Sequence, residues 1–300
     1  MKSNFEASSA MTARFATGIS RSRRSKLVTV RNLTRTLIYV ILVLLVVVEA
    51  FPLVWMLLTS VKNAREVFGT FLPASLDFSN FGRVWVSFNL PRHLLNSLYV
   101  TTLTVSIVVV VSTMAGYAFA RFHFMGKEMI FYAFMVAMMI PGQAILIPMF
   151  QFLKSTGLLN TLTGLSFSYL GGATAFAILL MRAFFLSLPK ELAEAARVDG
   201  AGEFRIFWSI YLPLAKPGIA TVVIIQSMNT WNEFMFASTF IITPATKTIQ
   251  PALFQAVGQY STDYTALSAG LTMALIPVVT VYLVLQRQFI EGMTAGALKG

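Results

Sequence analysis

The chain contains six apolar stretches that are each long enough to cross a lipid bilayer as a helix. They cover residues 37–58, 94–119, 129–153, 162–181, 214–236 and 267–285. The hydrocarbon core of a bilayer is about 30 Å thick, so a helix that rises about 1.5 Å per residue needs about 20 residues to cross it. We therefore predict an all-α integral membrane protein with six transmembrane helices.

Charged side chains are scarce inside these stretches, where only Glu49, Lys216 and Glu233 occur. The whole chain is 12% charged, whereas soluble domains are about 25% charged. We expect Glu49 to pair with polar neighbours in the bundle rather than to relay protons. Carriers that couple to protons or sodium tend to need several intramembrane carboxylates, so the energy for any transport is expected to come from elsewhere.

Lysine and arginine are distributed unevenly between the two sides that six crossings create. The segments on the side of the termini carry 17 of these residues and the opposite segments carry 6. Because cytoplasmic loops collect Lys and Arg, we expect both termini in the cytoplasm, with residues 1–35 as a basic cytoplasmic tail and residues 36–300 as a six-span domain. The same topology explains the net charge of +11, so we expect membrane lipid, and no nucleic acid, as a partner.

The N-terminal region also resembles a signal peptide, because the basic run RSRRSK precedes an apolar run. The apolar run of a signal peptide has about 7 to 15 residues, whereas this one continues to Leu58. An uncleaved first span is the better interpretation. The chain has no cysteine and no phosphate-binding GxxxxGK[ST] sequence, and neither His93 nor His123 belongs to a zinc-binding helical pair. We predict no catalytic residue and no metal site.

Residues 187–213 interrupt the apolar sequence with an amphipathic segment. Pro189 suits the first turn of a helix, residues 190–199 contain good helix formers, and Gly200 suits a left-handed helix terminus. A second short segment follows, whose aromatic side chains are expected at the membrane interface: Phe204, Phe207, Trp208 and Tyr211. We predict a helix, a turn and a helix on the cytoplasmic side of the membrane.

Two interpretations of this segment are open. It could anchor the fourth and fifth spans, or it could bind a cytoplasmic protein. Leu192, Ala195 and Ala196 are expected on one face of the first helix. The two alanines and Gly200 are small, which permits close approach of backbones and favours insertion into a partner's groove.

The run Glu194-Ala195-Ala196, Gly200, Ile210 and Leu212-Pro213 matches in full the spacing of the EAA signature, and in this the chain resembles the permeases of ATP-binding-cassette (ABC) importers. Further stretches are similar to the carbohydrate-uptake branch of that family, of the maltose-permease G type, from Leu37 to Gly300. They are FPLVWMLLTSVKN, NSLYV, AGYAFARFHF, IPGQAILIP, WNEF and EGMTAGALKG.

The resemblance implies that residues 187–213 are a coupling loop, whose helix between spans four and five docks on a cytoplasmic ATPase. The implied coupling residues are Glu194, Ala195, Ala196, Asp199, Gly200, Ile210, Leu212 and Pro213. It also implies a permease subunit in the inner membrane of a prokaryotic cell. Its partners would be a second permease subunit in a heterodimer, two ABC ATPases that bind the ATP, and an extracytoplasmic sugar-binding protein, with no cofactor in this chain.

A possible sugar pathway follows from the polar residues of the fifth span, which are Gln226, Asn229, Trp231, Asn232 and Glu233. Passage of a sugar requires hydrogen bonds that replace the hydration of its hydroxyls, together with an aromatic face. Gln226, Asn229 and Glu233 recur at helical spacing and are expected to line one face. The alternative is that these polar groups hold helices together or form a gate.

Other functions compete with an ATP-driven carbohydrate importer. They are a stand-alone secondary carrier or channel, a permease for another small solute, and a scaffold that anchors cytoplasmic proteins. ATP dependence of transport separates the importer from the carrier, and loss of transport on gene deletion excludes the scaffold. In the third span, Pro141 and Pro148 are expected to break or bend the helix.

The charge asymmetry generates a topology prediction. Single cysteines introduced at Ser75 and Thr262 should react with an impermeant thiol reagent added outside intact cells, and a cysteine at Ser187 should react only after the membrane is opened. The chain has no cysteine of its own, so the labelling is unambiguous. The reverse pattern would contradict the assigned orientation.

Overall fold

The computed structural model describes residues 32, 34–254, 257 and 262–297, and the side chains up to residue 288. These residues are helical or irregular, apart from an isolated bridge between Val257 and Thr262. The chain divides into two units, Met1–Leu57 and Leu58–Gly300, which we describe separately. Most of the predicted basic tail, residues 1–35, lies outside the described residues.

In the first unit a helix begins at Thr34 and continues to Ser60, three residues into the second unit. A stretch of 18 residues within its 27 has a mean hydropathy of 2.9, because Leu, Val and Ile predominate there. The predicted first span, residues 37–58, therefore lies inside a helix long enough to cross a membrane. Glu49 lies on this helix.

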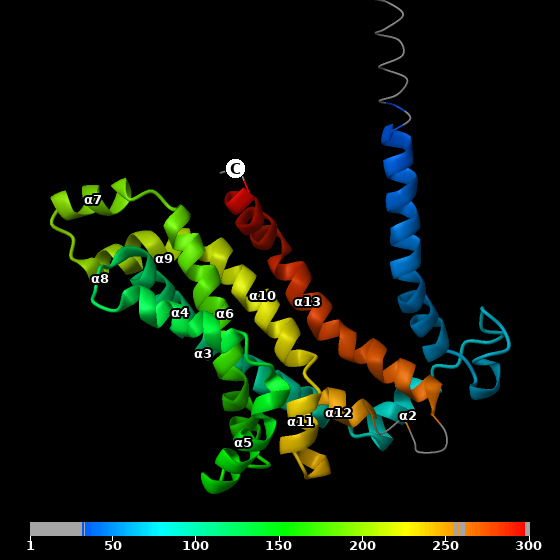
Figure 1. Cartoon of the computed structure of the whole chain (residues 1–300). Helices are drawn as coiled ribbons and strands as arrows, with labels where there is room; N and C mark the ends of the chain where they lie inside the picture. Colours follow the sequence, from blue (N-terminus) through cyan, green and yellow to red (C-terminus); the bar gives the residue numbers. More distant parts are fainter. Residues whose placement is uncertain (1–31, 33, 255–256, 258–261, 298–300) are drawn as a thin grey trace, which may run out of the picture. The chain divides into compact units, whose positions relative to one another are not determined.

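The second unit is all helical. Its larger helices are α2 (Ser79–Ser87), α3 (Leu90–Arg121), α4 (Lys127–Met138), α5 (Gly142–Ser155), α6 (Leu162–Ser187), α7 (Glu191–Val198), α10 (Lys216–Trp231) and α13 (Tyr264–Ala297). Its shorter elements are η1 (Ala64–Glu66), α8 (Glu203–Ile206), the π-helix η2 (Phe207–Tyr211), α9 (Leu212–Leu214), α11 (Met235–Phe240), η3 (Pro244–Thr246) and α12 (Ile249–Leu253). In Figure 1, α7 and α8 lie at one end of α3, α6 and α10, and α11, α12 and α2 lie at the other end.

The long apolar helices agree with the predicted membrane architecture. With Thr34–Ser60, the described chain has four helices that could each cross a bilayer, the others being α3, α6 and residues Tyr264–Gln288 of α13. Two further pairs, α4 with α5 and Glu203–Leu214 with α10, are bent by 98° and 67°. The six predicted spans are therefore recovered only if each bent pair counts as one span.

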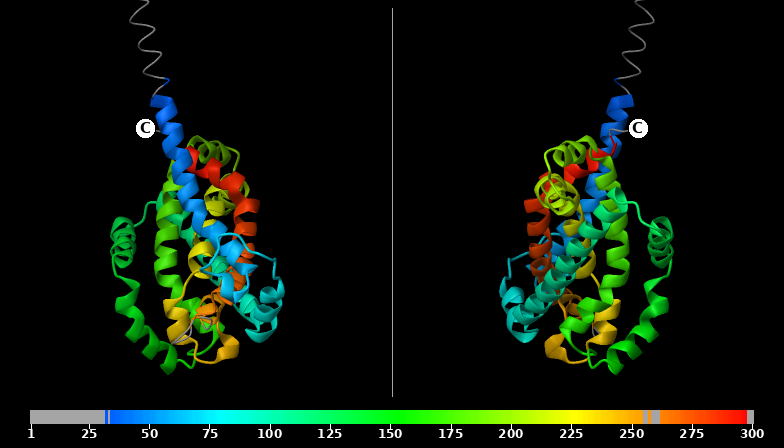
Figure 2. Two further views of the ribbon diagram at one scale, coloured as in Figure 1. Left: turned by 90° about the vertical axis from the view of Figure 1, so that its right-hand side faces the viewer. Right: turned by 90° about the vertical axis from the view of Figure 1, so that its left-hand side faces the viewer.

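The predicted third span, residues 129–153, is broken at Pro141, as expected, but not at Pro148. The α4–α5 arm, visible in both views of Figure 2, turns by 98° between Met138 and Gly142. Pro141 takes an extended backbone conformation immediately before α5. Because proline lacks an amide donor and disfavours a helical conformation at the residue before it, α4 ends at Met138 and does not continue into α5. Pro148 lies inside α5 and does not end that helix.

The predicted fifth span, residues 214–236, ends earlier than expected, because α10 stops at Trp231 and a new helix starts at Met235. The carboxylate of Glu233 accepts hydrogen bonds from the amides of Phe236 and Ala237, at 2.7 and 3.0 Å. These amides are in the first turn of α11, where they have no partner within the helix. Glu233 therefore stabilises the start of α11 and ends the span.

Close packing of α3 on α6 forms the centre of this unit. A Cβ atom on Gly116 would lie 2.6 Å from Cβ of Met181 and 2.9 Å from the backbone nitrogen of Arg182. The two helix backbones therefore approach each other as closely as a glycine allows. On this pair rests a buried cluster that includes Tyr117, Phe185 and residues of the 187–213 loop.

The opposite end of α3 holds the segment that follows α11. His93 Nδ1 lies 2.8 Å from the carbonyl oxygen of Lys247, and Asn96 Nδ2 donates to the same oxygen at 2.9 Å. The hydroxyl of Ser97 accepts from the amide of Ile249 at 2.8 Å. His93 is buried, so its position here is structural rather than interfacial.

The α3–α6 packing predicts a large effect of a single methyl group. Gly116→Ala should destabilise the protein by about 1 to 3 kcal/mol, because the new methyl meets backbone atoms that cannot move aside. Gly172→Ala in α6 is the matched control, since a Cβ atom there meets nothing within 4 Å. Thermal unfolding of the purified subunit in detergent measures both, and equal melting temperatures for the two variants would contradict this packing.

Candidate functional site

The 187–213 loop has the predicted local structure of a helix, a turn and a helix. Helix α7 ends at Val198, and Gly200 follows with a φ of +80°. A Cβ atom on Gly200 would meet nothing within 4 Å, so glycine is favoured here by its backbone conformation and not by space. The chain then continues through α8 and η2 into α9.

Helix α7 has one face toward its own protein and one face open. Ala193 is 5% exposed and Ala196 is half-buried against the same cluster. Leu192, Ala195 and Asp199 are exposed, at the spacing of one helix face. Ala196, four residues after Leu192, lies at the edge of this face, where it is partly buried against the same cluster as Ala193.

The segment after the turn is also divided between an inner and an outer side. Phe207 and Tyr211 are buried in the cluster with Ile206, whereas Phe204 and Trp208 are exposed with their rings 5.9 Å apart. The expectation that all four aromatic side chains lie at the membrane interface is wrong for Phe207 and Tyr211.

The remaining residues of the signature after Gly200 lie at the end of the loop. Ile210 and Leu212 are half-buried, Leu212 packs on the buried cluster, and Pro213 is exposed. Glu194 is exposed on α7. The open surface of the loop is therefore made by α7 rather than by these later positions.

An ion pair crosses the turn between α7 and α8. Arg197 Nε donates to Glu203 Oε1 at 2.6 Å. This hydrogen bond raises the pKa of the Arg197 guanidinium. Both side chains are about half exposed, so the pair contributes little to stability and chiefly orients the two short helices.

Arg121 and Tyr211 attach the loop to the helices beneath it. An Arg121 Nη2 donor reaches the carbonyl oxygens of Phe185 and Leu188, each at 2.7 Å. The guanidinium carbon lies 4.6 Å from the centre of the Tyr211 ring, and the Tyr211 hydroxyl donates to the carbonyl of Pro189 at 3.2 Å. From the sequence, Tyr211 was expected only at the membrane interface, and Arg121 was given no role.

A groove lies between the α4–α5 arm and helices α6, α10 and α11. Its volume is about 660 Å³. The wall combines aromatic rings of Phe134, Tyr169, Phe176 and Phe236 with the polar side chains of Gln226, Asn229 and Glu233. At Gly171 and Gly172 the wall is bare backbone, since a Cβ atom there meets nothing within 4 Å.

The three polar residues predicted to share a face therefore line the same groove, but they differ in burial and in hydrogen bonding. Gln226 is buried and donates to the carbonyl of Ala173 at 3.3 Å. Glu233 accepts from the hydroxyl of Tyr169 at 2.7 Å, besides its two amides. Both contacts join helices. Asn229 is exposed, and its side chain has no hydrogen-bond partner within the described part of the chain.

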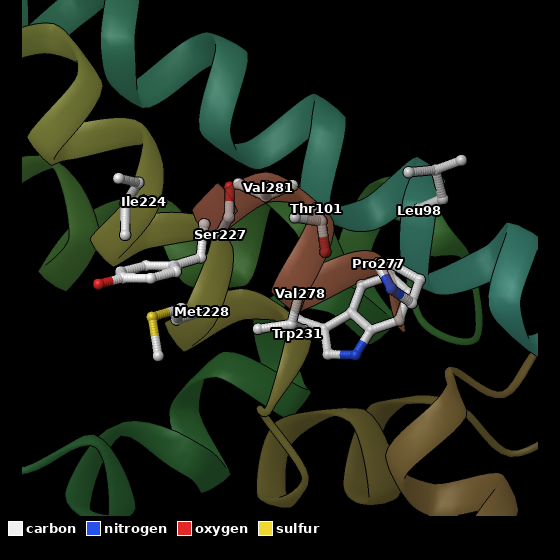
Figure 3. Close-up of a pocket in the computed structure, with 10 residues that line it drawn as sticks. Leu98, Thr101, Ile224, Ser227, Met228, Trp231, Pro277, Val278 and Val281 are labelled. Atoms are coloured by element: carbon white, nitrogen blue, oxygen red, sulfur yellow. The ribbon is translucent and has the colours of Figure 1, made fainter. Parts of the chain in front are cut away.

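Trp231 and Asn232, the other two residues predicted for a sugar pathway, do not line this groove. Trp231 is 5% exposed, packs with Leu90 and Leu253, and lines a small apolar pocket between α3, α10 and α13 (Figure 3). Asn232 Oδ1 accepts from Gln250 at 3.4 Å. A helix turns by about 100° per residue, so Trp231 lies far around α10 from Asn229.

Known proteins resemble the chain along most of its length. Residues 109–294 match the family described as the binding-protein-dependent transport system inner membrane component. The chain is 36% identical over 267 residues to the probable ABC transporter permease protein YurM of Bacillus subtilis, covering 88% of this chain and 89% of that protein. It is 32% identical to the diacetylchitobiose uptake system permease protein NgcG of Streptomyces coelicolor, covering 87% and 88%.

A solved structure agrees with these relatives. A bacterial ABC transporter involved in the import of the acidic polysaccharide alginate has a chain that superposes with a TM-score of 0.73 at 26% identity. The match covers 83% of this chain and 94% of that one. The match to the family includes both the 187–213 loop and the residues that α10 contributes to the groove.

The contrast between Trp231 and Asn229 generates a prediction. Trp231→Ala should lower stability by about 3 to 5 kcal/mol, because it opens a cavity in a buried cluster. Asn229→Ala, two residues away on the same helix, removes an exposed side chain and should change stability by less than about 0.5 kcal/mol. Thermal unfolding in detergent separates the two, and a destabilised Asn229→Ala would show that its amide is structural.

Proposed function

The chain belongs to the family of binding-protein-dependent transport system inner membrane components, and we propose that it forms half of the translocation pathway of an ATP-driven carbohydrate importer. The observation that carries this proposal is the family match over residues 109–294, which covers both the open face of α7 and the residues that α10 contributes to the groove. Membership in a transport family that depends on binding proteins also argues against a stand-alone carrier, a channel or a scaffold.

The groove supports a sugar as the transported solute. Sugars present hydroxyls to amides and apolar faces to aromatic rings, and this groove offers Asn229 beside Tyr169 and Phe236, whose rings are stacked at 6.2 Å and 21°. The relative named for diacetylchitobiose uptake and the structure described for alginate import both concern saccharides. A permease for another small solute is the alternative, and uptake assays separate the two.

The exposed face of α7 supports docking on an ATPase. Leu192, Ala195 and Asp199 are exposed on it, and Leu192 is the one bulky apolar side chain among them; short helices with small residues fit grooves closely. We assign this face to a cytoplasmic ABC ATPase, of which the complex would hold two copies with a second permease subunit and an extracytoplasmic sugar-binding protein. Both termini of the chain would then lie in the cytoplasm.

The docking proposal predicts the effect of a charge on α7. Ala195→Asp should place an unpaired carboxylate in an apolar contact, which costs about 1 to 3 kcal/mol, and so release the ATPase from membranes and abolish uptake. The amount of inserted subunit should stay normal, since Ala195 touches no buried cluster. Ser209→Asp is the control, because Ser209 is exposed on the same loop outside α7.

Co-purification of the ATPase with the Ala195→Asp subunit, together with full uptake, would contradict docking through this face. Ala196→Asp is a poorer test, because Ala196 is half-buried against the chain's own cluster. Its substitution should disturb the loop itself. Gly200→Val should cost roughly 1 to 2 kcal/mol through the left-handed backbone alone.

The groove proposal predicts a moderate loss of uptake. Asn229→Ala should lower sugar uptake by about 2- to 10-fold, the equivalent of one net hydrogen bond of about 0.5 to 1.5 kcal/mol, while the complex stays assembled. Ser238→Ala, at an exposed position of α11 outside the groove, should leave uptake unchanged. Initial uptake rates in whole cells measure both, and identical rates would remove Asn229 from the pathway.

A further inference from the structure

The C-terminal end of α3 is joined to the C-terminal end of α6 by Arg121. The guanidinium donates to the carbonyl of Phe185, in the last turn of α6, and to that of Leu188, just beyond it. Carbonyls at the end of a helix lack partners within it and carry the negative end of the helix dipole. A cation from a neighbouring helix therefore satisfies them and fixes where the loop leaves α6.

The exit of the loop is joined to its entry by Tyr211. Its side chain is fully buried, its ring lies against the guanidinium of Arg121, and its hydroxyl donates to the carbonyl of Pro189. Pro189 precedes α7, and Tyr211 is the last residue of η2. Both ends of the loop that carries α7 are therefore held at one point, the end of α3.

Aromatic packing around Tyr117, one turn before Arg121 on α3, also attaches the loop to the end of this helix. The ring of Tyr117 lies 5.5 Å from that of Phe185, 4.9 Å from that of Phe207 and 5.3 Å from that of Tyr211. Phe185 belongs to α6, and the other two rings belong to the loop. Three segments of the chain thus share one dense cluster around Tyr117.

The other end of α3 is attached as firmly to a different segment. His93 and Asn96 hold the carbonyl of Lys247, and Ser97 holds the amide of Ile249. A helix of 32 residues is about 48 Å long at about 1.5 Å per residue. One helix therefore connects the loop at one end of the unit with residues 245–249 at the other.

We propose that Arg121 is a positioning residue for coupling, which makes the 187–213 loop and α3 move as one body. A displacement of α7 by the ATPase would then reach residues 245–249 on the far side, where a binding protein would sense it. This inference rests on the proposed function. If Arg121 only caps α6, its loss lowers the amount of folded protein but not the work done by each assembled complex.

The surroundings of Arg121 supply a matched control. The Tyr117 hydroxyl is buried and has no hydrogen-bond partner among the described residues, whereas the Tyr211 hydroxyl binds the carbonyl of Pro189. Tyr117→Phe and Tyr211→Phe make the same chemical change in the same cluster. Only the second removes a contact that ties the loop to its own entry.

The test uses the assembled transporter in proteoliposomes with its binding protein and sugar. Arg121→Lys keeps the charge but loses the planar guanidinium, which lies over the Tyr211 ring while its Nη2 donates to both carbonyls. We expect sugar transported per ATP hydrolysed to fall by about tenfold, within the range of about 5- to 150-fold typical of coupling between sites, while basal ATP hydrolysis per complex stays unchanged. Tyr211→Phe should lower the ratio less, and Tyr117→Phe should leave it unchanged.

A distance measurement tests the positioning role directly. Spin labels at Val198, 88% exposed at the end of α7, and at Leu95, 65% exposed near the far end of α3, should give a narrow distance distribution in the wild type and a broad one in Arg121→Lys. An unchanged distribution, or uptake that falls only in proportion to the complex present, would overturn the proposal. If Arg121→Lys fails to assemble, Tyr211→Phe decides. A wild-type complex that takes up no sugar would instead refute the proposed function, and the distance result would still stand.

Discussion

The close approach of α3 and α6 at Gly116 is the contact on which the rest of the second unit depends. Because Gly116 has no side chain, Met181 and the backbone at Arg182 come within van der Waals distance of α3. Arg121, five residues later on α3, can therefore reach the carbonyls at the end of α6. In a membrane, where lipid competes for apolar contacts, small residues at helix crossings and polar contacts between helices decide the packing. Both kinds of contact occur here within two turns of α3, at Gly116 and at Arg121.

The packing of α3 on α6 supports two sites, the 187–213 loop and the groove. The 187–213 loop is polar and held by α3, so the open face of α7 is presented on a fixed base. The wall of the groove is bare backbone at its glycines, and the α4–α5 arm beside it is broken at Pro141. Gln226 and Glu233 make hydrogen bonds that support the helices, whereas the Asn229 side chain has no hydrogen-bond partner in the described part of the chain. Polar residues with one spacing thus divide between two that support the fold and one that, in the proposed function, meets the sugar.

Much of this could be predicted from the sequence, because a bilayer sets a length that apolar runs must meet. The all-α membrane class and the family are confirmed, and the loop's local structure follows from Pro189 and Gly200. The end of α10 could not be predicted, since it depends on where the Glu233 carboxylate meets two amides. Trp231 was predicted to lie on the sugar pathway because it is aromatic, whereas its position around α10 turns it into a buried cluster. Arg121 was missed because the excess of positive charge on one side of the membrane already explained its presence, and only the structure shows the two carbonyls it binds.

The central claim is that the exposed face of α7 is the contact between this subunit and its ATPase. A photoreactive benzophenone amino acid placed at Ala195, in cells that express the whole transporter, tests it most directly. The account predicts an ultraviolet-dependent cross-link between this subunit and the ABC ATPase, and none from the same amino acid placed at Ser209. A transporter that retains its ATPase through purification but forms no cross-link from Ala195, or forms it from Ser209 alone, would contradict the account.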